Sequence, residues 1–492
     1  MFGFEKIKKN FFLYSIEKAL HTKVGRDVIL KKFEEKVYES FFSEENQLPK
    51  VQLKKYQWVR AFVRQLIKNF DKNYISQDVF KKTIYTLGLN NFFKSENSEA
   101  EKARTRFKEK YGTEPPLFIT ISPTQKCNLK CIGCYASSSP QTGKSLPASI
   151  VDRILKEAYE EFGNRFLVIS GGEPLLYSSE GKTLFDYWQQ YNDVFCIFYT
   201  NGTLINKQVA EKLAKLGNAF PQISVEGFEK ETDERRGKGV FKRILKAMEN
   251  LREAGVPFAV SVTATTKNLP LLLTDEFYQF WFEEQGASYM WIFQLMPIGR
   301  GKNVFDLMPS PEQRVMLYRK WEELLEKGYP IADFWNSGPL ANGCIAFGRP
   351  NGYFYIDWNG YITPCVFIPY YVDNIYDLYK EGKTLADAWN NLFFRNGREW
   401  QKEYGYPYSK NAKNWLMPCA IRDNYHTFRT KICTPDVKPE NQEAKEAMNS
   451  EEYYQKLVEY DKQLEALTLP IWQNEYLKTE KSEASNNSKM AA

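Results

Sequence analysis

The chain has 492 residues, 43% of them hydrophobic and 16% aromatic, so it is long enough for two to four folding units around a large apolar interior. The formal net charge is only +6, which does not indicate a nucleic-acid-binding body. No apolar run approaches the roughly 18 residues of a membrane span, and residues 1–10 lack a signal-peptide pattern. We therefore expect a cytoplasmic protein.

The N-terminal region, residues 1–112, lacks strand-like runs and predicts an all-helical segment. Its first 110 residues hold 24 Lys and Arg against 14 Asp and Glu, a net +10 that leaves −4 for the remainder. Between residues 58 and 70, apolar side chains recur at helical spacing with Lys and Arg between them. This helix could pack on the main domain, or it could lie on the inner face of a membrane or cover an apolar substrate.

Residues 113–330 alternate between predicted strands and helices. The strands are expected at 117–122, 166–170, 195–199, 221–225, 258–263 and 290–295, and the helices at 148–162, 183–191, 206–216, 241–254, 272–284 and 312–327. The alternation predicts an α/β core with a parallel sheet, either doubly wound or curled into a barrel. The functional site of such a sheet forms at the carboxyl ends of its strands.

The alternation stops near residue 335. Segments 353–357 and 361–363 flank an Asn-Gly turn and predict a hairpin in a small cysteine-rich α+β domain, residues 331–440. Residues 441–492 predict a charged helical tail with a helix near 450–467, and composition predicts disorder from Lys481 onward.

Three cysteines, Cys127, Cys131 and Cys134, follow the first predicted strand within eight residues. Thiolates are the usual ligands of iron–sulfur clusters, which need four ligands when every iron is held by protein. A set of three leaves one iron open, as catalytic zinc sites leave one position open for the reactant. Zinc is the alternative, but zinc motifs favour paired C-x2-C units and no second pair lies nearby.

The C-x3-C-x2-C motif after an N-terminal strand resembles that of the radical S-adenosylmethionine (radical SAM) superfamily. The resemblance implies a partial (β/α)6 barrel and a [4Fe–4S] cluster whose open iron binds S-adenosylmethionine. It also implies reductive cleavage of that molecule to a 5′-deoxyadenosyl radical, which abstracts hydrogen from a substrate. A small electron donor such as flavodoxin or ferredoxin would then be a partner of this oxidoreductase-like enzyme.

Further short motifs follow in the order that this family shows, nearly all at strand ends. The resemblance implies cofactor-binding roles for ten residues: Tyr135, Gly171, Gly172, Glu173, Thr200, Asn201, Ser224, Glu226, Arg236 and Met296. Among them, Glu173 would hold the methionine ammonium group and Arg236 would lie near the methionine carboxylate. The sequence departs from the family at Gly133, where an aromatic residue usually precedes the third cysteine.

A second set of cysteines lies beyond the predicted sheet: Cys344, Cys365, Cys419 and Cys433. The first two, with Gly360 between them, resemble the start of the auxiliary-cluster extension called SPASM, or of its shorter form, twitch. Four cysteines suffice for one fully ligated auxiliary [4Fe–4S] cluster. Structural zinc or a partly unused set is the alternative. Cys196 lies inside an apolar strand and is expected to be a core residue.

The substrate is not encoded in any motif, and no catalytic residue can be singled out; with only two histidines, histidine-based acid–base chemistry is not expected. The basic, aromatic N-terminal helix favours a lipid or long-chain apolar substrate. A radical maturase that modifies a peptide or protein is the alternative. A non-catalytic iron–sulfur protein is an alternative of another class, although a simple carrier would not need the cofactor-binding motifs. A nucleic-acid substrate is not expected.

Overall fold

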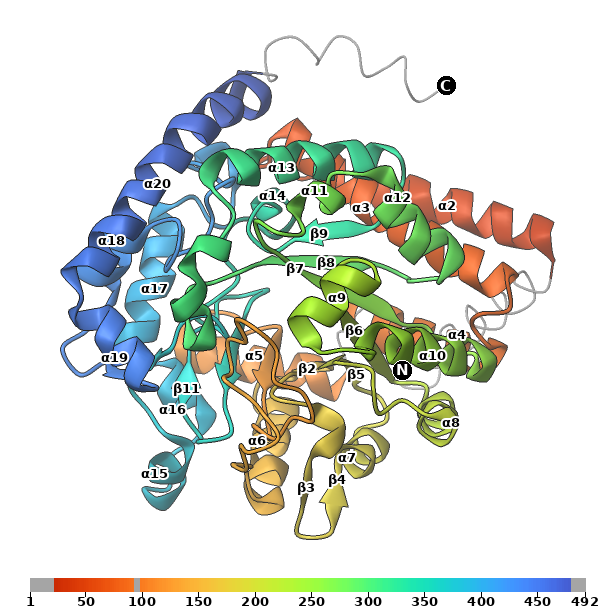
Figure 1. The fold of residues 1–492 in the computed structure, drawn as a ribbon, viewed down its shortest axis with the longest axis horizontal. Helices are drawn as coiled ribbons and strands as arrows, with labels where there is room; N and C mark the ends of the chain where they lie inside the picture. Colours follow the sequence, from red (N-terminus) through yellow and green to blue (C-terminus); the bar gives the residue numbers. More distant parts are fainter. Residues whose placement is uncertain (1–21, 93–97, 479–492) are drawn as a thin grey trace.

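The computed structural model describes residues 22–92 and 98–478. A nine-stranded sheet forms its centre, in the order β11-β10-β1-β2-β5-β6-β7-β8-β9, and all neighbours are parallel except β10 and β11 (Figure 1). The strands are β1 (Phe118–Ile121), β2 (Phe166–Ile169), β5 (Phe195–Thr200), β6 (Ala219–Val225), β7 (Ala259–Ala264), β8 (Met290–Gln294), β9 (Ile331–Asp333), β10 (Tyr353–Ile356) and β11 (Ile362–Thr363). Two small ladders pair β3 (Ser178–Ser179) with β4 (Lys182–Thr183) and β12 (Tyr370–Tyr371) with β13 (Lys438–Pro439).

Helices connect the parallel strands and bury one apolar face each. In α10, for example, Ile244, Met248 and Leu251 are fully buried and follow the 3.6-residue period. The connecting helices are α6 (Ala148–Glu160), α7 (Leu184–Gln190), α8 (Lys207–Leu216), α9 (Glu229–Arg236), α10 (Val240–Ala254), α11 (Leu269–Leu272), α12 (Asp275–Gln279), η3 (Phe280–Glu284), η4 (Gly299–Leu307) and α13 (Pro311–Glu326). The predicted α/β core and its six strands are confirmed. The helix expected at 272–284 begins at Asp275, where α12 continues directly into η3, and Leu272 instead ends α11.

The sheet extends beyond the six predicted strands. β10 pairs in parallel with β1, with Phe118 opposite Tyr353 and Ile121 opposite Ile356, and β9 pairs with β8. The hairpin of β10 and β11 is confirmed; Gly360 in its turn has a φ of 79°, which favours glycine. The domain boundaries at residues 112, 330 and 440 remain predictions.

Short helices surround the second set of cysteines. They are α14 (Gly338–Ala341), α15 (Ile375–Lys380), α16 (Leu385–Trp389), α17 (Leu392–Glu403), η5 (Ser409–Asn411), α18 (Tyr425–Thr427), η6 (Phe428–Ile432) and α19 (Gln442–Asn449). The chain then continues into α20 (Glu451–Ile471), which packs against α13, and η7 (Trp472–Leu477). The predicted disorder from Lys481 onward lies outside the described residues.

The N-terminal part is helical in the described residues and packs on the core. It contains α2 (Lys23–Phe42), α3 (Pro49–Asp71), α4 (Gln77–Thr83), η1 (Ile84–Phe92) and α5 (Glu99–Tyr111). In α3, Gln65 Nε2 donates to the carbonyls of Phe282 and Ala287, both at 3.2 Å, and Asn69 Nδ2 donates to that of Gly286 at 2.7 Å. These buried bonds support the interpretation that this helix packs on the main domain.

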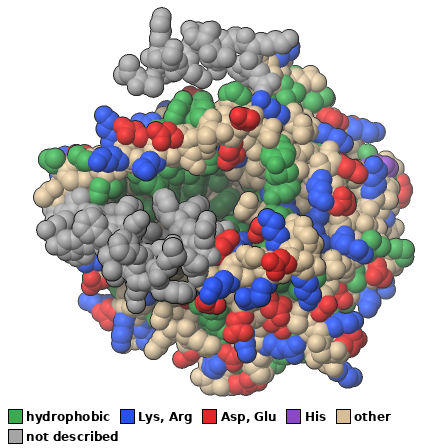
Figure 2. Space-filling model, turned by 180° about the vertical axis from the view of Figure 1, so that it is seen from behind, with side chains coloured by type: hydrophobic (Ala, Val, Ile, Leu, Met, Phe, Trp, Pro, Cys, Tyr) green, Lys and Arg blue, Asp and Glu red, His purple; other side chains and the backbone are tan. Residues whose placement is uncertain are grey.

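The surface mixes charges of both signs. Figure 2 shows Lys, Arg, Asp and Glu side chains interspersed over the rear face, around a hollow in which hydrophobic side chains gather. Within residues 22–92 and 98–478, no helix has the length and hydropathy needed to cross a bilayer.

A buried carboxyl group on α20 leads to a prediction about pH. Asp461 Oδ2 accepts a hydrogen bond from the Tyr425 amide at 2.7 Å, while Oδ1 has no partner among the described residues. Burial, reinforced by the charge of Asp423, raises the Asp461 pKa from 3.8 to about 8, and Arg314 and Arg422 offset only part of this rise. Between pH 3.8 and about pH 8, the native state binds more protons at Asp461 than the unfolded state does. The contribution of Asp461 to the free energy of unfolding therefore falls as the pH rises through this range.

We therefore expect Asp461→Asn to raise the free energy of unfolding relative to the wild type at about pH 8 and much less at about pH 5. Urea unfolding of the anaerobic protein at both pH values measures the difference. Glu465→Gln, on the exposed side of α20, is the matched control and should show no such pH dependence. An equal effect of Asp461→Asn at both pH values would contradict the prediction.

Candidate functional site: a cysteine loop and a second cysteine cavity

The loop after β1 brings Cys127, Cys131 and Cys134 close enough for their charges to interact. Burial raises the pKa of Cys127 to about 12 and also raises that of Cys131. Such thiols keep their protons at neutral pH unless a metal displaces them. The Leu129 amide points at Cys127 Sγ at 3.4 Å and Asn201 Nδ2 at 3.8 Å, so donors that stabilise a thiolate are already in place.

The glycine pair at the end of β2 fixes the start of this loop. A Cβ atom on Gly172 would lie 2.2 Å from the Lys126 carbonyl oxygen, and one on Gly171, whose φ is 131°, would lie 2.6 Å from that of Thr124. The Gly172 amide donates to Thr124 O at 2.9 Å, and the next amide, of Glu173, donates to Lys126 O at 2.7 Å. Both glycines are therefore required by close backbone packing directly before Cys127.

The Glu173 carboxylate is fully buried and braces the turn after β5. Oε1 accepts from Thr200 Oγ1 at 2.8 Å and from the Leu175 amide at 3.2 Å, and Oε2 accepts from the Asn201 amide at 2.8 Å. Burial raises the pKa of Glu173 to about 7, although these donors and Arg236 act in the opposite direction. Asn201 Nδ2 in turn donates to Asn128 Oδ1 at 2.8 Å, which links this turn to the cysteine loop.

Glu226, which follows β6, joins two arginines beside the cysteines. Its Oε1 accepts from Arg236 Nε at 2.9 Å and from Arg235 Nη1, while Oε2 is buried without a partner among the described residues. Both guanidinium groups lower the pKa of Cys131 against the larger effect of burial. The site therefore offers positive charge to thiolates and one buried oxygen that needs a donor from a bound molecule.

Arg300 was not assigned a role from the sequence, yet it clamps the cysteine loop. Its Nη2 donates to the carbonyls of Cys131 at 3.1 Å and Ser138 at 2.7 Å, and its amide donates to that of Cys134 at 3.2 Å. The sequence did hold one indication of a role for Arg300. It lies in the loop after β8 that also contains Met296, which is buried and was predicted to bind cofactor.

The departure at Gly133 has a steric reason. Its φ is 66°, and a Cβ atom there would lie 2.9 Å from Leu295 Cδ1. The neighbouring Tyr135 is partly buried, and its hydroxyl shares a hydrogen bond of 2.7 Å with Ser170 Oγ. The remaining predicted residue, Ser224, shares a hydrogen bond of 3.3 Å with Ser261.

Three cysteines of the second set line one cavity of about 970 Å³, part of which is open to solvent: Cys344, Cys365 and Cys419. Cys433 is not among the lining residues. Trp58 of α3 and Trp291 of β8 lie on the wall, as does Phe367, whose ring also lies 5.9 Å from that of Tyr135. Phe367 thus touches both the cavity and the residue that follows the first cysteine set.

Across the described residues, no three His, Cys, Asp or Glu side chains are grouped so that they could hold a single metal ion. A [4Fe–4S] cluster places a different iron against each thiolate, so its ligands do not have to meet at one ion.

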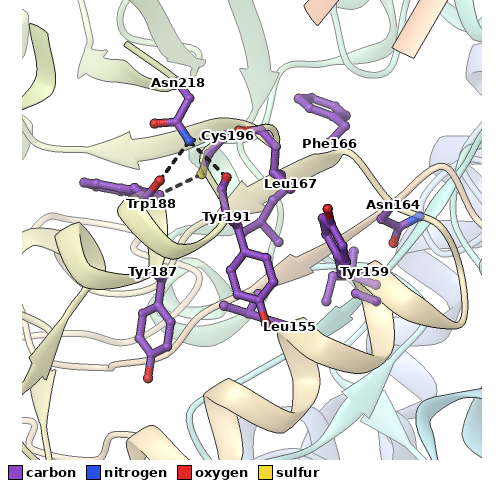
Figure 3. Close-up of a pocket in the computed structure, with 13 residues that line it drawn as sticks. Leu155, Tyr159, Asn164, Phe166, Leu167, Tyr187, Trp188, Tyr191, Cys196 and Asn218 are labelled. Atoms are coloured by element: carbon purple, nitrogen blue, oxygen red, sulfur yellow. Dashed lines mark hydrogen bonds between the residues drawn. The ribbon is translucent and has the colours of Figure 1, made fainter. Parts of the chain in front are cut away.

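Cys196 belongs to neither set. It lies in the apolar pocket of Figure 3, where Trp188 Nε1 donates to its Sγ at 3.2 Å and Asn218 bonds the carbonyls of Trp188 and Tyr191. Burial raises the pKa of its thiol to about 12. The structure is consistent with the predicted role as a core residue.

Residues 121–273 match the family described as the Radical SAM superfamily. Mycofactocin maturase MftC of Mycobacterium tuberculosis is 32% identical over 306 residues, which cover 58% of this chain and 74% of that protein. AdoMet-dependent heme synthase of Methanosarcina barkeri is 26% identical, covering 58% and 86% respectively. The crystal structure of Streptococcus suis SuiB bound to precursor peptide SuiA is 20% identical, covers 63% of this chain and 77% of that one, and has a TM-score of 0.48.

Proposed function

This chain belongs to the radical S-adenosylmethionine superfamily, and on that premise we propose that it is an enzyme that modifies a peptide. As a member it is an enzyme that uses a [4Fe–4S] cluster and S-adenosylmethionine. The assignment of individual residues to these cofactors, the peptide substrate and the electron donor are parts of the proposal.

The residues around the cysteine loop fit the two cofactors. Cys127, Cys131 and Cys134 would hold the cluster, and the arginines beside Cys131 offset the negative charge of three thiolates. When bound, the cluster supplies the electron that cleaves S-adenosylmethionine to methionine and the 5′-deoxyadenosyl radical. The unpartnered Glu226 Oε2 would accept a hydrogen bond from the bound S-adenosylmethionine. Arg300 holds the loop still, which keeps the thiols in position.

The cavity beside the second cysteine set carries the substrate proposal. Its wall is aromatic and aliphatic, it opens to solvent, and Phe367 connects it to Tyr135. Trp58 lies on the cavity wall, and its buried indole N–H has no partner among the described residues, so we propose that it donates to a peptide carbonyl. Two relatives are named as maturation proteins, the mycofactocin maturase and the 27% identical sporulation killing factor maturation protein SkfB of Bacillus subtilis. This supports a peptide over the lipid or long-chain substrate that the N-terminal helix suggested.

The test uses the reconstituted, dithionite-reduced full chain with S-adenosylmethionine. A pool of synthetic peptides that differ at one aromatic or aliphatic residue is compared with phosphatidylglycerol vesicles. We expect 5′-deoxyadenosine to form faster with some peptides, and deuterium placed on their side chains to appear in it. Trp58→Ala should weaken this peptide stimulation and leave the slow formation without peptide unchanged. Stimulation by the vesicles alone would overturn the peptide proposal.

A further inference from the structure

The second cysteine set consists of three cysteines together and one apart. Cys344, Cys365 and Cys419 line the same cavity, and the charges of Cys344 and Cys365 both oppose ionisation of Cys419. Burial is the main cause that raises the pKa of each of the three thiols. Three thiols that line one cavity, one of them buried and two partly buried, form a ligand set of the same size as the one after β1.

Hydrogen-bond donors already point at these sulfur atoms. The Tyr353 hydroxyl lies 3.0 Å from Cys365 Sγ, and the Phe367 amide donates to the same sulfur at 3.4 Å. The amides of Ala346 and Ala420 and the side chain of Gln401 lower the pKa of Cys344 against the effect of burial. Donors of this kind stabilise thiolates and tune the potential of a cluster that they hold.

Cys433 lies in different surroundings. It follows η6; burial raises its pKa to about 12, and the charge of Arg429 acts in the opposite direction. A negative charge on Cys433 raises the pKa of Tyr370 and of Tyr425, and neither tyrosine lines the cavity. Among the described residues, Cys344, Cys365 and Cys419 line the cavity and Cys433 does not.

The described residues of the cavity wall offer no fourth ligand. Apart from the cysteines, the wall has two side chains with oxygen atoms, Asp333 and Ser337. The Asp333 oxygens accept from Gln294 Nε2 and Asn336 Nδ2, both at 2.9 Å, and from the Trp335 amide, also at 2.9 Å. Ser337 Oγ accepts from the Asp333 amide at 2.8 Å. The rest of the wall is hydrocarbon, aromatic rings and backbone.

We infer that Cys344, Cys365 and Cys419 hold an auxiliary [4Fe–4S] cluster by three thiolates, that Cys433 is not a ligand, and that the fourth iron faces the cavity and is open to one exogenous thiolate. This differs from the four-cysteine set that the sequence suggested. Soft thiolates are preferred ligands of iron–sulfur clusters. The inference rests on family membership and not on the peptide proposal, so either can fail without the other.

The test isolates the auxiliary site in the full chain by the triple substitution Cys127→Ala, Cys131→Ala and Cys134→Ala. After anaerobic reconstitution without free thiols, this protein should contain about four iron and four sulfide per chain. Adding Cys433→Ser should leave that content unchanged, as should the core control Cys196→Ala. Adding Cys344→Ser, Cys365→Ser or Cys419→Ser should lower it. Loss of iron with Cys433→Ser in a protein that keeps its circular dichroism spectrum would overturn the inference, as would stoichiometric zinc in place of iron.

A second measurement needs no change at Cys433. The dithionite-reduced auxiliary cluster of the triple variant is titrated with 2-mercaptoethanol, and its electron paramagnetic resonance spectrum is recorded. We expect the g values to shift to a new, saturable set, as an open iron would show. A spectrum that does not change at any thiol concentration would show a fully ligated cluster and would overturn the open position.

Discussion

Replacing Cys131 with alanine is expected to remove about four iron atoms per chain and to abolish formation of 5′-deoxyadenosine. Two remaining thiolates cannot hold the cluster that binds S-adenosylmethionine, and Arg235 and Arg236 would then face a site without the charge they offset. Iron and sulfide analysis after anaerobic reconstitution, followed by chromatography of the reaction with dithionite, measures both effects.

Cys196→Ala is the matched control, because this thiol lies in the apolar pocket of Figure 3 and is absent from both cysteine sets. It should keep its iron and its activity. If Cys131→Ala still formed 5′-deoxyadenosine at the wild-type rate, the assignment of the cysteine loop would be wrong.

Removing the Asp423 carboxylate is expected to cause the largest loss of stability. Asp423 and Arg314 form an ion pair with both side chains fully buried; Nη2 lies 2.9 Å from Oδ2, and Nη1 bonds Oδ1. Asp423→Ala leaves the guanidinium buried without its charge partner, which typically costs about 3–5 kcal/mol. Because Asp423 Oδ2 also accepts from the Cys419 amide at 3.1 Å, the second cysteine set should lose metal more readily as well.

Chemical denaturation of the anaerobic protein measures this loss, and Glu399→Ala provides the control. Glu399 pairs with Lys402 on α17, where the two side chains are 65% and 62% exposed. Such a surface pair contributes about 0–1 kcal/mol. Similar losses for Asp423→Ala and Glu399→Ala would show that burial of the Arg314 pair does not control stability.

The local elements of the core could be predicted from the sequence, because each strand is a short apolar run and each connecting helix has one apolar face. The pairing of β10 with β1 could not, since Tyr353 and Phe118 are far apart in the chain and neither run specifies its partner. The hairpin at Gly360 was predictable from its turn, but its place in the main sheet was not.

The candidate site likewise has features that the sequence predicted and features that it did not. The spacing of Cys127, Cys131 and Cys134 was enough to predict a shared site. Position in the chain already made Cys433 the weakest member of the second set, since it lies well beyond the other three. That it does not line the cavity with Cys419 depends on the folding of the segment between them. The clamp made by Arg300 depends on two loops that meet only in three dimensions.

The bonds between α3 and η7 also constrain how the protein matures. Lys50 Nζ lies 2.7 Å from Glu475 Oε2 and 4.7 Å from the ring centre of Tyr476, a contact between residues 425 positions apart. It cannot form until residue 475 has been synthesised, and contacts of such long range form late. Trp58 lies on the same helix as Lys50, so the cavity wall acquires its final support after both cysteine sets have been synthesised. Both cysteine sets are therefore available to iron and sulfide before η7 docks on α3.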